Sequence, residues 1–160
     1  MVDDINILRD LSLAEQLGRV SRLWKTVADR ELAPLGLTHP RWTAIWKLQR
    51  LGDNISQKAL AEALEIELHS LMRTLNQLEE QSLIVRHCCT HDKRARIVSL
   101  TTQGQNLIKQ IEARILRVRR DLLGHIDEEQ LHKLTLILEQ IAQNALHTLS
   151  EPFNSDSQEQ

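Results

Sequence analysis

The sequence predicts a mainly α-helical protein of the α+β class, with long helices at both ends of the chain around a compact centre that contains one β-hairpin. Apolar residues recur at a spacing of three and four over both ends, which is the period of an amphipathic helix. Between residues 84 and 100 the pattern changes to two β-branched runs separated by a polar segment, which indicates a hairpin. Only 5 Gly and 3 Pro occur in 160 residues, which argues against a turn-rich all-β fold.

Composition excludes several classes of protein. The chain has 20 Lys+Arg against 22 Asp+Glu, so its net charge of −2 excludes a uniformly basic coat for nucleic acid but not a local basic patch. It contains neither G-x-G-x-x-G nor G-x-x-x-x-G-K-[ST], the motifs of the commonest nucleotide-binding folds. The first residues are acidic, and no run approaches about 18 apolar residues, so we expect a cytoplasmic protein without a membrane partner.

The first quarter of the chain predicts one long helix and the start of a second. The first helix ends before Ala33-Pro34-Leu35-Gly36, where proline and glycine break the pattern. Its apolar stripe consists of Leu13, Leu17, Val20, Trp24 and Val27. The second helix follows Thr38, which we interpret as its N-cap, and tolerates Pro40 in its first turn before ending near Leu51.

The centre of the chain has the spacing of a winged helix-turn-helix. Ser56 caps a short helix that runs to Leu64, and the three residues 65–67 form a turn of the expected length. Residues 68–80 then form the second, recognition helix. The hairpin strands are expected at residues 84–89 and 96–100, and together they form the wing.

The last third predicts two more long helices, one after Thr101 that is interrupted at Gly124 and one that Asp127 opens. The polar tail, residues 154–160, is expected to be disordered. A centre of about sixty residues cannot cover the apolar stripes of all the end helices, so we expect them to pair with a second copy. The predicted organisation is a helical dimerisation region, 1–37 and 102–153, and a winged helix-turn-helix, 38–101; the alternative is a monomeric bundle.

The recognition helix has two chemically different sides. A helical wheel gathers five apolar residues on one arc, namely Leu68, Leu71, Met72, Leu75 and Leu78. The opposite side carries His69, Ser70, Arg73, Thr74 and Gln77. These side chains can read base edges in a major groove, although a polar helix face is often only solvated. The turn spacing and the hairpin that follows favour a DNA-binding interpretation.

The wing is locally basic. Between Ile84 and Val98, the four basic residues exceed the one acidic residue by three: Arg86, Lys93, Arg94 and Arg96 against Asp92. A basic tip of this kind suits the narrow minor groove, where the negative potential is strong. The alternative interpretation is a solvated turn that carries surface charges.

Two segments resemble the MarR family of transcriptional regulators: Asp92-Lys93-Arg94-Ala95-Arg96 followed by Leu100-Thr101-Thr102-Gln103-Gly104, and residues 75–86. Within the family, Arg22-Leu23-Trp24, residues 32–38, Trp42 and residues 70–75 are most similar to the SlyA subgroup and its Hor/Rap-like regulators. The resemblance implies a homodimer that binds palindromic, A·T-rich operators in double-stranded DNA. It also implies repression, or activation by competition with nucleoid silencing proteins, at virulence, exoenzyme or antibiotic-biosynthesis genes.

The resemblance also implies roles for single residues. Arg94 would enter the minor groove with Asp92 as its orienting partner, Arg96 would contact phosphate, and Arg73 and its neighbours would read the major groove. We also expect DNA contacts from Ser56, Gln57, Lys93 and Arg86. One departure is Ser82, which stands where the family usually has glycine, at the end of the recognition helix.

The family often senses small aromatic carboxylates such as salicylate, which the resemblance extends to this chain. The expected ligand residues combine cations with flat aromatic walls. They are Arg22, Lys25, His39, Trp42 and Trp46. The simpler alternative is that Trp42 and Trp46, one turn apart, only pack in the core.

The sequence does not favour a metal site, a redox role or enzyme activity. His87, Cys88, Cys89 and His91 alternate across a strand and do not easily converge on one metal ion, so we expect no metal or cofactor. A redox role is also disfavoured, because the family's peroxide sensors carry the reactive cysteine in the first helix. No enzyme is expected, since Glu65 and His69 lack further partners. The remaining alternative function is a helical protein-interaction module, such as an anti-activator, that does not bind DNA.

Overall fold

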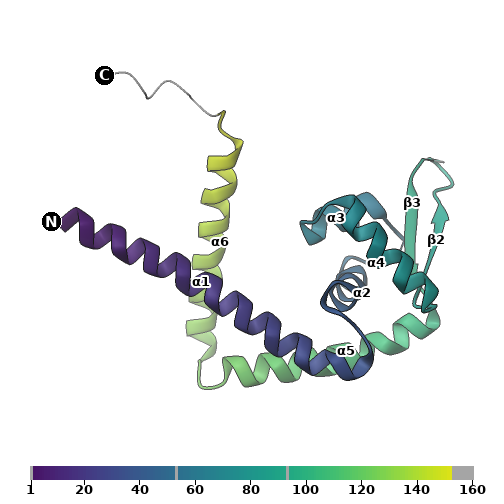
Figure 1. Cartoon of the computed structure of the whole chain (residues 1–160), viewed down its shortest axis with the longest axis horizontal. Helices are drawn as coiled ribbons and strands as arrows, with labels where there is room; N and C mark the ends of the chain where they lie inside the picture. The colour runs from purple at the N-terminus through teal and green to yellow at the C-terminus, as the bar shows by residue number, and fades with distance from the viewer. Residues whose placement is uncertain (1, 53, 93, 153–160) are drawn as a thin grey trace. The chain divides into compact units, whose positions relative to one another are not determined.

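The computed structural model describes residues 2–52, 54–92 and 94–152, with side chains from residue 12 onward (Figure 1). Its elements in chain order are α1 Val2–Leu32, η1 Ala33–Leu35, α2 His39–Leu51, β1 Ile55–Ser56, α3 Gln57–Leu64, α4 Leu68–Glu80, β2 Ile84–Cys88, β3 Arg96–Leu100, α5 Thr102–Leu123 and α6 Glu128–Ser150. The predicted fold class is confirmed: long helices surround a small sheet. The chain forms two compact units, 1–122 and 123–160, and the predicted tail lies outside the described residues.

The sheet is antiparallel, with the strand order β1-β3-β2. The hairpin pairs Ile84 with Leu100 at its base and Cys88 with Arg96 toward its tip, as expected for the wing. Sequence analysis did not predict β1, which pairs Ile55 with Val98. A two-residue strand has no period to detect, so only its partner strand reveals it.

The core of the first unit lies between the short helices and the sheet. Its fully buried side chains come from α2, α3, α4 and the hairpin: Ile45, Leu48, Leu60, Leu71, Leu75, Leu78, Ile84 and Val98. The C-terminal end of α1 and the body of α5 join this core through Leu32 and Ile111. Glu31 of α1 also binds α5, because its carbonyl accepts from Arg114 at 2.9 Å and its carboxylate from Arg117 at 2.9 Å.

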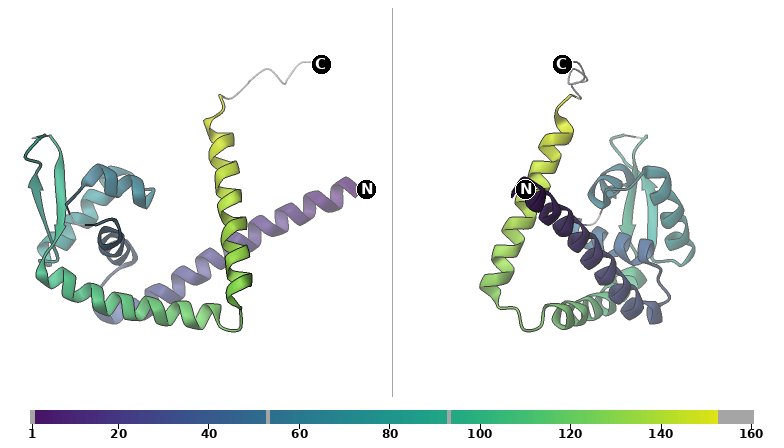
Figure 2. Two further views of the ribbon diagram at one scale, coloured as in Figure 1. Left: turned by 180° about the vertical axis from the view of Figure 1, so that it is seen from behind. Right: turned by 60° about the vertical axis from the view of Figure 1, so that its left-hand side comes forward.

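The base of the wing leads directly into α5 (Figure 2), and hydrogen bonds hold this junction together. The Thr101 hydroxyl donates to the Ser82 carbonyl at 2.7 Å and accepts from the Gly104 amide at 3.0 Å, which caps α5. A side chain at position 104 would overlap the Leu83 carbonyl oxygen, so the close approach requires glycine. Ser82 has a left-handed φ of 60°, the conformation that favours the glycine usual in the family.

The second unit contains α6, which begins with a capping box. The Asp127 carboxylate accepts from the Gln130 amide at 2.8 Å, and the Gln130 side chain accepts from the Asp127 amide at 3.3 Å. Within one chain α6 buries no residue, and its exposed apolar side chains include Leu134, Leu138, Ile141 and Leu149. Among the described residues, no helix has the length and apolar character needed to cross a membrane.

Candidate nucleic-acid interface

The helix-turn-helix is set by caps at both ends of α3. The Ser56 hydroxyl accepts from the Ala59 amide at 3.1 Å, as its predicted N-cap role requires. At the other end Glu65 adopts a left-handed φ of 55°, and the Ile66 amide donates to the Ala61 carbonyl at 3.1 Å. These bonds close the three-residue turn, so α4 begins at Leu68 as predicted.

The exposed face of α4 differs in part from the expected one. His69, Ser70, Arg73 and Gln77 are exposed, and their side chains have no hydrogen bond or ion pair within the part of the chain that the structure describes. Arg73 and His69 border a hollow of about 500 Å³, together with Pro40 and Ile66. These four polar side chains are therefore available to a partner.

The expectations for Thr74 and Leu68 are wrong. Thr74 is only 6% exposed, and its hydroxyl donates to the Ser70 carbonyl at 3.5 Å. Leu68, expected in the core, is 45% exposed. The buried arc of α4 is therefore turned toward Thr74, and α2 is one of the helices that pack against α4. A wheel drawn from the sequence cannot locate this neighbouring helix.

The tip of the wing is organised by Asp92, whose carboxylate accepts from the backbone amide of Arg94 at 2.9 Å. The Ala95 amide donates to the Asp92 carbonyl at 3.1 Å, which closes the turn. Asp92 thus orients the backbone at Arg94, and no contact with the guanidinium is seen. Arg94 and Arg96 are exposed and form no ion pair among the described residues, whereas Lys93 lies outside them.

A groove of about 360 Å³ lies between the wing tip and the beginning of α3 and α4. Arg94 and Arg96 line it from the wing, and Ser56 and Lys58 line it from α3. Lys58 was not predicted as a contact, although its position at the start of a helix facing the wing could have suggested one. The groove gathers three cations, which suits the sugar-phosphate backbone between two DNA grooves.

Gln57 also lines this groove but is largely buried, and its predicted DNA contact stays a prediction. It is only 8% exposed, and its side-chain oxygen is buried without a hydrogen-bond partner in the described structure. It packs among residues of α4 and the hairpin that include Met72 and Arg96. The first position of a helix is usually solvated, so this burial follows from the wing folding over the start of α3.

Arg86, a predicted DNA contact, is paired within the chain, so its contact with DNA stays a prediction. Its guanidinium donates from Nε to Oε2 of Glu79 at 3.1 Å and from Nη2 to Oε1 of Glu79 at 3.2 Å. Nη2 also donates to Oδ1 of Asn76 at 2.7 Å, and the side chain is 15% exposed. The hydrogen bond from Arg86 lowers the pKa of Glu79, although partial burial opposes this effect. The guanidinium is therefore committed to α4.

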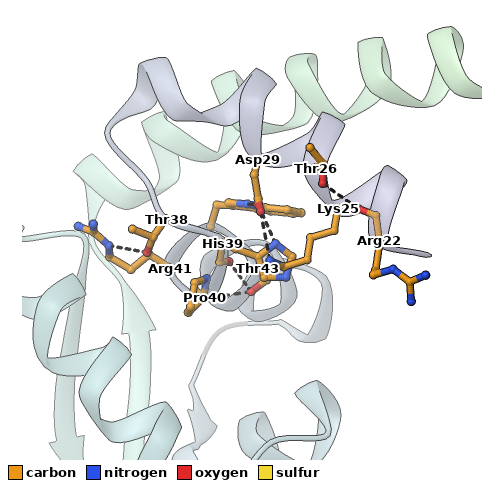
Figure 3. A network of polar contacts seen from close by, with 10 residues as sticks. Arg22, Lys25, Thr26, Asp29, Thr38, His39, Pro40, Arg41 and Thr43 are labelled. Atoms are coloured by element: carbon orange, nitrogen blue, oxygen red, sulfur yellow. Dashed lines mark hydrogen bonds and ion pairs between the residues drawn. The ribbon is translucent and has the colours of Figure 1, made fainter. Parts of the chain in front are cut away.

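The expected ligand residues divide into two groups (Figure 3). Lys25, His39 and Trp42 converge on Asp29, whose carboxylate lies 3.5 Å from the Lys25 ammonium and accepts from His39 at 2.7 Å and from the Trp42 indole at 3.0 Å. Arg22 is directed away from this cluster. Lys25 and His39 are thus already paired with the carboxylate of Asp29.

A separate apolar cavity of about 360 Å³ lies where α1, α2 and α5 meet. Its walls consist of Trp24, Ala28, Trp42, Trp46, Arg50, Ile115, Leu116, Val118 and Arg119. Only Trp42 and Trp46 of the expected set line it. Its cations are Arg50, whose guanidinium lies 4.9 Å from the centre of the Trp46 ring, and Arg119. The spacing of Trp46 and Arg50 could have suggested this pair, but Arg119 comes from a distant helix.

Comparison with known proteins places these sites in a family. The model of the MarR family matches residues 35–95, which span α2 to the wing. The transcriptional regulator PA3341, whose crystal structure is known, is 35% identical; the match covers 84% of this chain and 98% of that protein, with a TM-score of 0.78. The chain belongs to the MarR family.

Two more distant members share the fold of this MarR-family chain. A mutant MarR from E. coli, solved in complex with operator DNA, is 21% identical with a TM-score of 0.76, and the match covers 83% of this chain and 95% of that one. The transcriptional regulator SlyA is 20% identical with a TM-score of 0.75, and the match covers 83% and 93%. These two are equally similar, so the SlyA subgroup still rests on the sequence motifs.

The cysteines of this MarR-family protein are both free. Cys88 is exposed at the end of β2, and Cys89 is half-buried. Within the described residues, no group of three or more His, Cys, Asp or Glu side chains could hold a metal ion.

Asp29 should make stability depend on acid pH. Partial burial raises its pKa, but hydrogen bonds from Trp42 and His39, with the charges of His39 and Lys25, outweigh this and leave the pKa lowered. The stabilisation is therefore present above the ordinary pKa of an aspartate, about 4, and is lost as the pH falls below it. We expect Asp29→Asn to lower the free energy of unfolding by about 1 kcal/mol at pH 6.

The measurement is urea denaturation from pH 6 to pH 3.5, in which the difference between Asp29→Asn and the unmodified protein should shrink. The control is Asp121→Asn, because Asp121 is exposed on α5 and has no ion pair among the described residues. A difference that does not change with pH would contradict the role of the charge.

Proposed function

We propose that this chain is a homodimeric, sequence-specific transcriptional regulator that places α4 in the major groove and the wing, residues 84–100, in the minor groove. The observation that carries the proposal is a set of exposed cations without an ion pair among the described residues: Arg73 on α4, and Lys58, Arg94 and Arg96, which line one groove between α3 and the wing. Arginines that only stabilise a fold have carboxylate partners, as Arg86 and Arg117 do here. The complex of E. coli MarR with operator DNA supports the same use of the fold.

The chemistry of the two elements suggests how a sequence would be read. Arg73 can bind a guanine edge through two hydrogen bonds, and Gln77 can bind adenine in the same way. Arg94 suits a narrow minor groove, which A·T-rich DNA provides. We therefore propose an A·T-rich operator in which α4 supplies most of the base-specific contacts.

Dimerisation would follow from the apolar stripes that a single chain leaves exposed. On α1 the stripe consists of Leu13, Leu17, Val20 and Trp24, and on α6 it consists of Leu134, Leu138, Ile141 and Leu149. Exposed stripes of this length are typical of an interface with another protein, and we propose a second copy of the chain. Two recognition helices about 34 Å apart would then require a palindromic operator.

For the regulatory role we propose the SlyA type, which rests on the sequence motifs of that subgroup. The regulator would repress by excluding polymerase or activate by competing with nucleoid silencing proteins, at virulence, exoenzyme or antibiotic-biosynthesis genes. It would act in the bacterial cytoplasm, in association with the nucleoid. The alternative function is a helical anti-activator, which would keep the exposed stripes but would not need Arg73 or Arg94.

We also propose that a small aromatic carboxylate, with salicylate as the model compound, occupies the cavity between α1, α2 and α5. The tryptophan walls would stack on the ring, and Arg50 or Arg119 would bind the carboxylate. Because the cavity joins α1 to α2, an occupant would shift the winged domain relative to the N-terminal arm. Arg50 and Arg119 thus take the place of Arg22, Lys25 and His39 as the proposed partners of the ligand's carboxylate.

The DNA-binding function is tested by Arg94→Ala. An operator is first selected from a random duplex library with the unmodified protein. We then expect Arg94→Ala to weaken binding about tenfold and to reduce the salt dependence by about one phosphate contact, because an unpaired cation in the groove is lost. Arg120→Ala removes the same charge about 27 Å along α5 from its start and should have little effect. Unchanged affinity in Arg94→Ala would favour the anti-activator.

The dimer is tested by Ile141→Arg, which adds a charge to the exposed stripe of α6 without disturbing a buried contact. We expect monomers in analytical ultracentrifugation and loss of binding to the selected palindrome, since half of the contacts disappear. Gln140→Arg adds the same charge one residue away, off the stripe, and should remain dimeric. A monomer in the unmodified protein would support the alternative of a single-chain bundle.

The ligand site is tested by titrating salicylate and recording tryptophan fluorescence and operator affinity. We expect Arg50→Gln to weaken salicylate binding about tenfold, since it loses a charge-assisted hydrogen bond. Arg22→Gln should bind as the unmodified protein does, because Arg22 does not line the cavity. If salicylate changes neither fluorescence nor DNA binding, the tryptophans are only core residues.

A further inference from the structure

One cluster of polar side chains joins the recognition helix to the wing. Arg86 of β2 binds both carboxylate oxygens of Glu79, at 3.1 and 3.2 Å, and the amide oxygen of Asn76 at 2.7 Å. Two parallel N–H···O bonds fix the plane and direction of a guanidinium as well as its distance. We call Glu79, Asn76 and Arg86 the clamp.

The clamp links β2 to α4 two residues beyond the buried Ile84. Ile84, Arg86 and Cys88 lie on one face of the strand, because side chains alternate. Ile84 is buried at the base, whereas Cys88 is exposed. Arg86 pairs with Val98, and only two residues farther along β2 Cys88 pairs with Arg96, one of the unpaired cations. Beyond the clamp, β2 has no buried side chain before the tip.

At this level β3 is held by packing and pairing, because Val98, the strand partner of Arg86, is fully buried and also pairs with Ile55 of β1. On the β2 side, by contrast, the clamp borders open space. A cavity of about 270 Å³ lies beside it, lined by Gln57, Met72, Asn76, Glu79, Arg86 and Arg96. The Gln57 side-chain oxygen at its wall is buried and has no hydrogen-bond partner in the described structure. A void leaves its lining without contacts on one side, so here the link between β2 and α4 is made by the hydrogen bonds of the clamp, in addition to the pairing of β3 with β1.

We propose that Glu79 is a positioning residue for DNA binding, which holds the wing through Arg86 at the angle where Arg94 and Arg73 engage one duplex. The inference rests on the proposed function. Two contact elements bind the same rigid duplex well only when their spacing is set beforehand, because otherwise binding must order the wing. Glu79 itself would not contact the DNA.

Whether neutralising Glu79 strengthens or weakens DNA binding distinguishes a positioning role from a purely electrostatic one. A carboxylate beside the binding surface repels phosphate, so its neutralisation alone would strengthen DNA binding. Neutralisation of Glu79 would also release Arg86 to bind phosphate, and this effect would likewise strengthen DNA binding. The positioning role predicts the opposite, a weaker complex.

The test measures binding of the full-length protein to the duplex selected by the unmodified protein. We expect Glu79→Gln to weaken binding about fivefold. The matched control is Glu80→Gln, which removes the same charge from the next residue; Glu80 is exposed and has no ion pair within the described residues, so no loss is expected. Thermal unfolding of both variants establishes that the same folded protein is compared.

Two double-mutant cycles then locate the effect. Glu79→Gln should cost nothing further in the Arg94→Ala background, where the minor-groove contact is already lost, and its full amount in the Arg73→Ala background. Arg86→Gln should reproduce the loss without adding to that of Glu79→Gln. It should also leave the salt dependence unchanged, because Arg86 contacts no phosphate.

Equal or tighter binding by Glu79→Gln would overturn the proposal, as would a loss of the same size in the Arg94→Ala background. A lower salt dependence in Arg86→Gln would instead assign Arg86 to the DNA backbone and also overturn it. If the unmodified protein selects no duplex, the proposed function fails and the positioning role fails with it. That outcome is distinguishable because it is read from the unmodified protein alone.

Discussion

Burial of one ridge of α4 is the constraint on which the rest of the DNA-facing surface depends. Leu71, Leu75 and Leu78 are essentially inaccessible to solvent, and they hold α4 against α2, α3 and the sheet. Because a helix is rigid, fixing this ridge fixes the direction of every other side chain on it. Arg73 faces outward for that reason, and Glu79 lies on the flank where Arg86 reaches it.

Arginines in this chain fall into two physical classes. Arg86, Arg114 and Arg117 have carboxylate partners and join elements to one another, whereas Arg73, Arg94 and Arg96 have none among the described residues. A net charge of −2 conceals this division, since it averages cations that are already neutralised with cations that are not. Arg73, Arg94 and Arg96 lie on α4 and the wing, where the field of a polyanion would act.

The region between α1 and α2 shows a similar division of roles. Asp29 of α1 accepts hydrogen bonds from His39 and Trp42 of α2, and these bonds fasten the N-terminal helix to the winged domain, while Lys25 pairs with Asp29 from the same helix. The neighbouring cavity keeps its own cations, Arg50 and Arg119, beside tryptophan. A site that joins two elements and retains unsatisfied charge can couple its occupancy to their relative position.

The sequence by itself determined most of the helices and strands and two of the helix caps. The apolar period located α2, α3, α4 and α5, Ser56 and Asp127 marked two helix starts, and the three-residue turn indicated the helix-turn-helix, because these signals act within a few residues. Only the tertiary structure decided which polar residues remain available. Thr74 and Gln57 are buried, and Arg86 is held by Glu79. Burial and ion pairing depend on neighbours that are distant in sequence, and no local period records them.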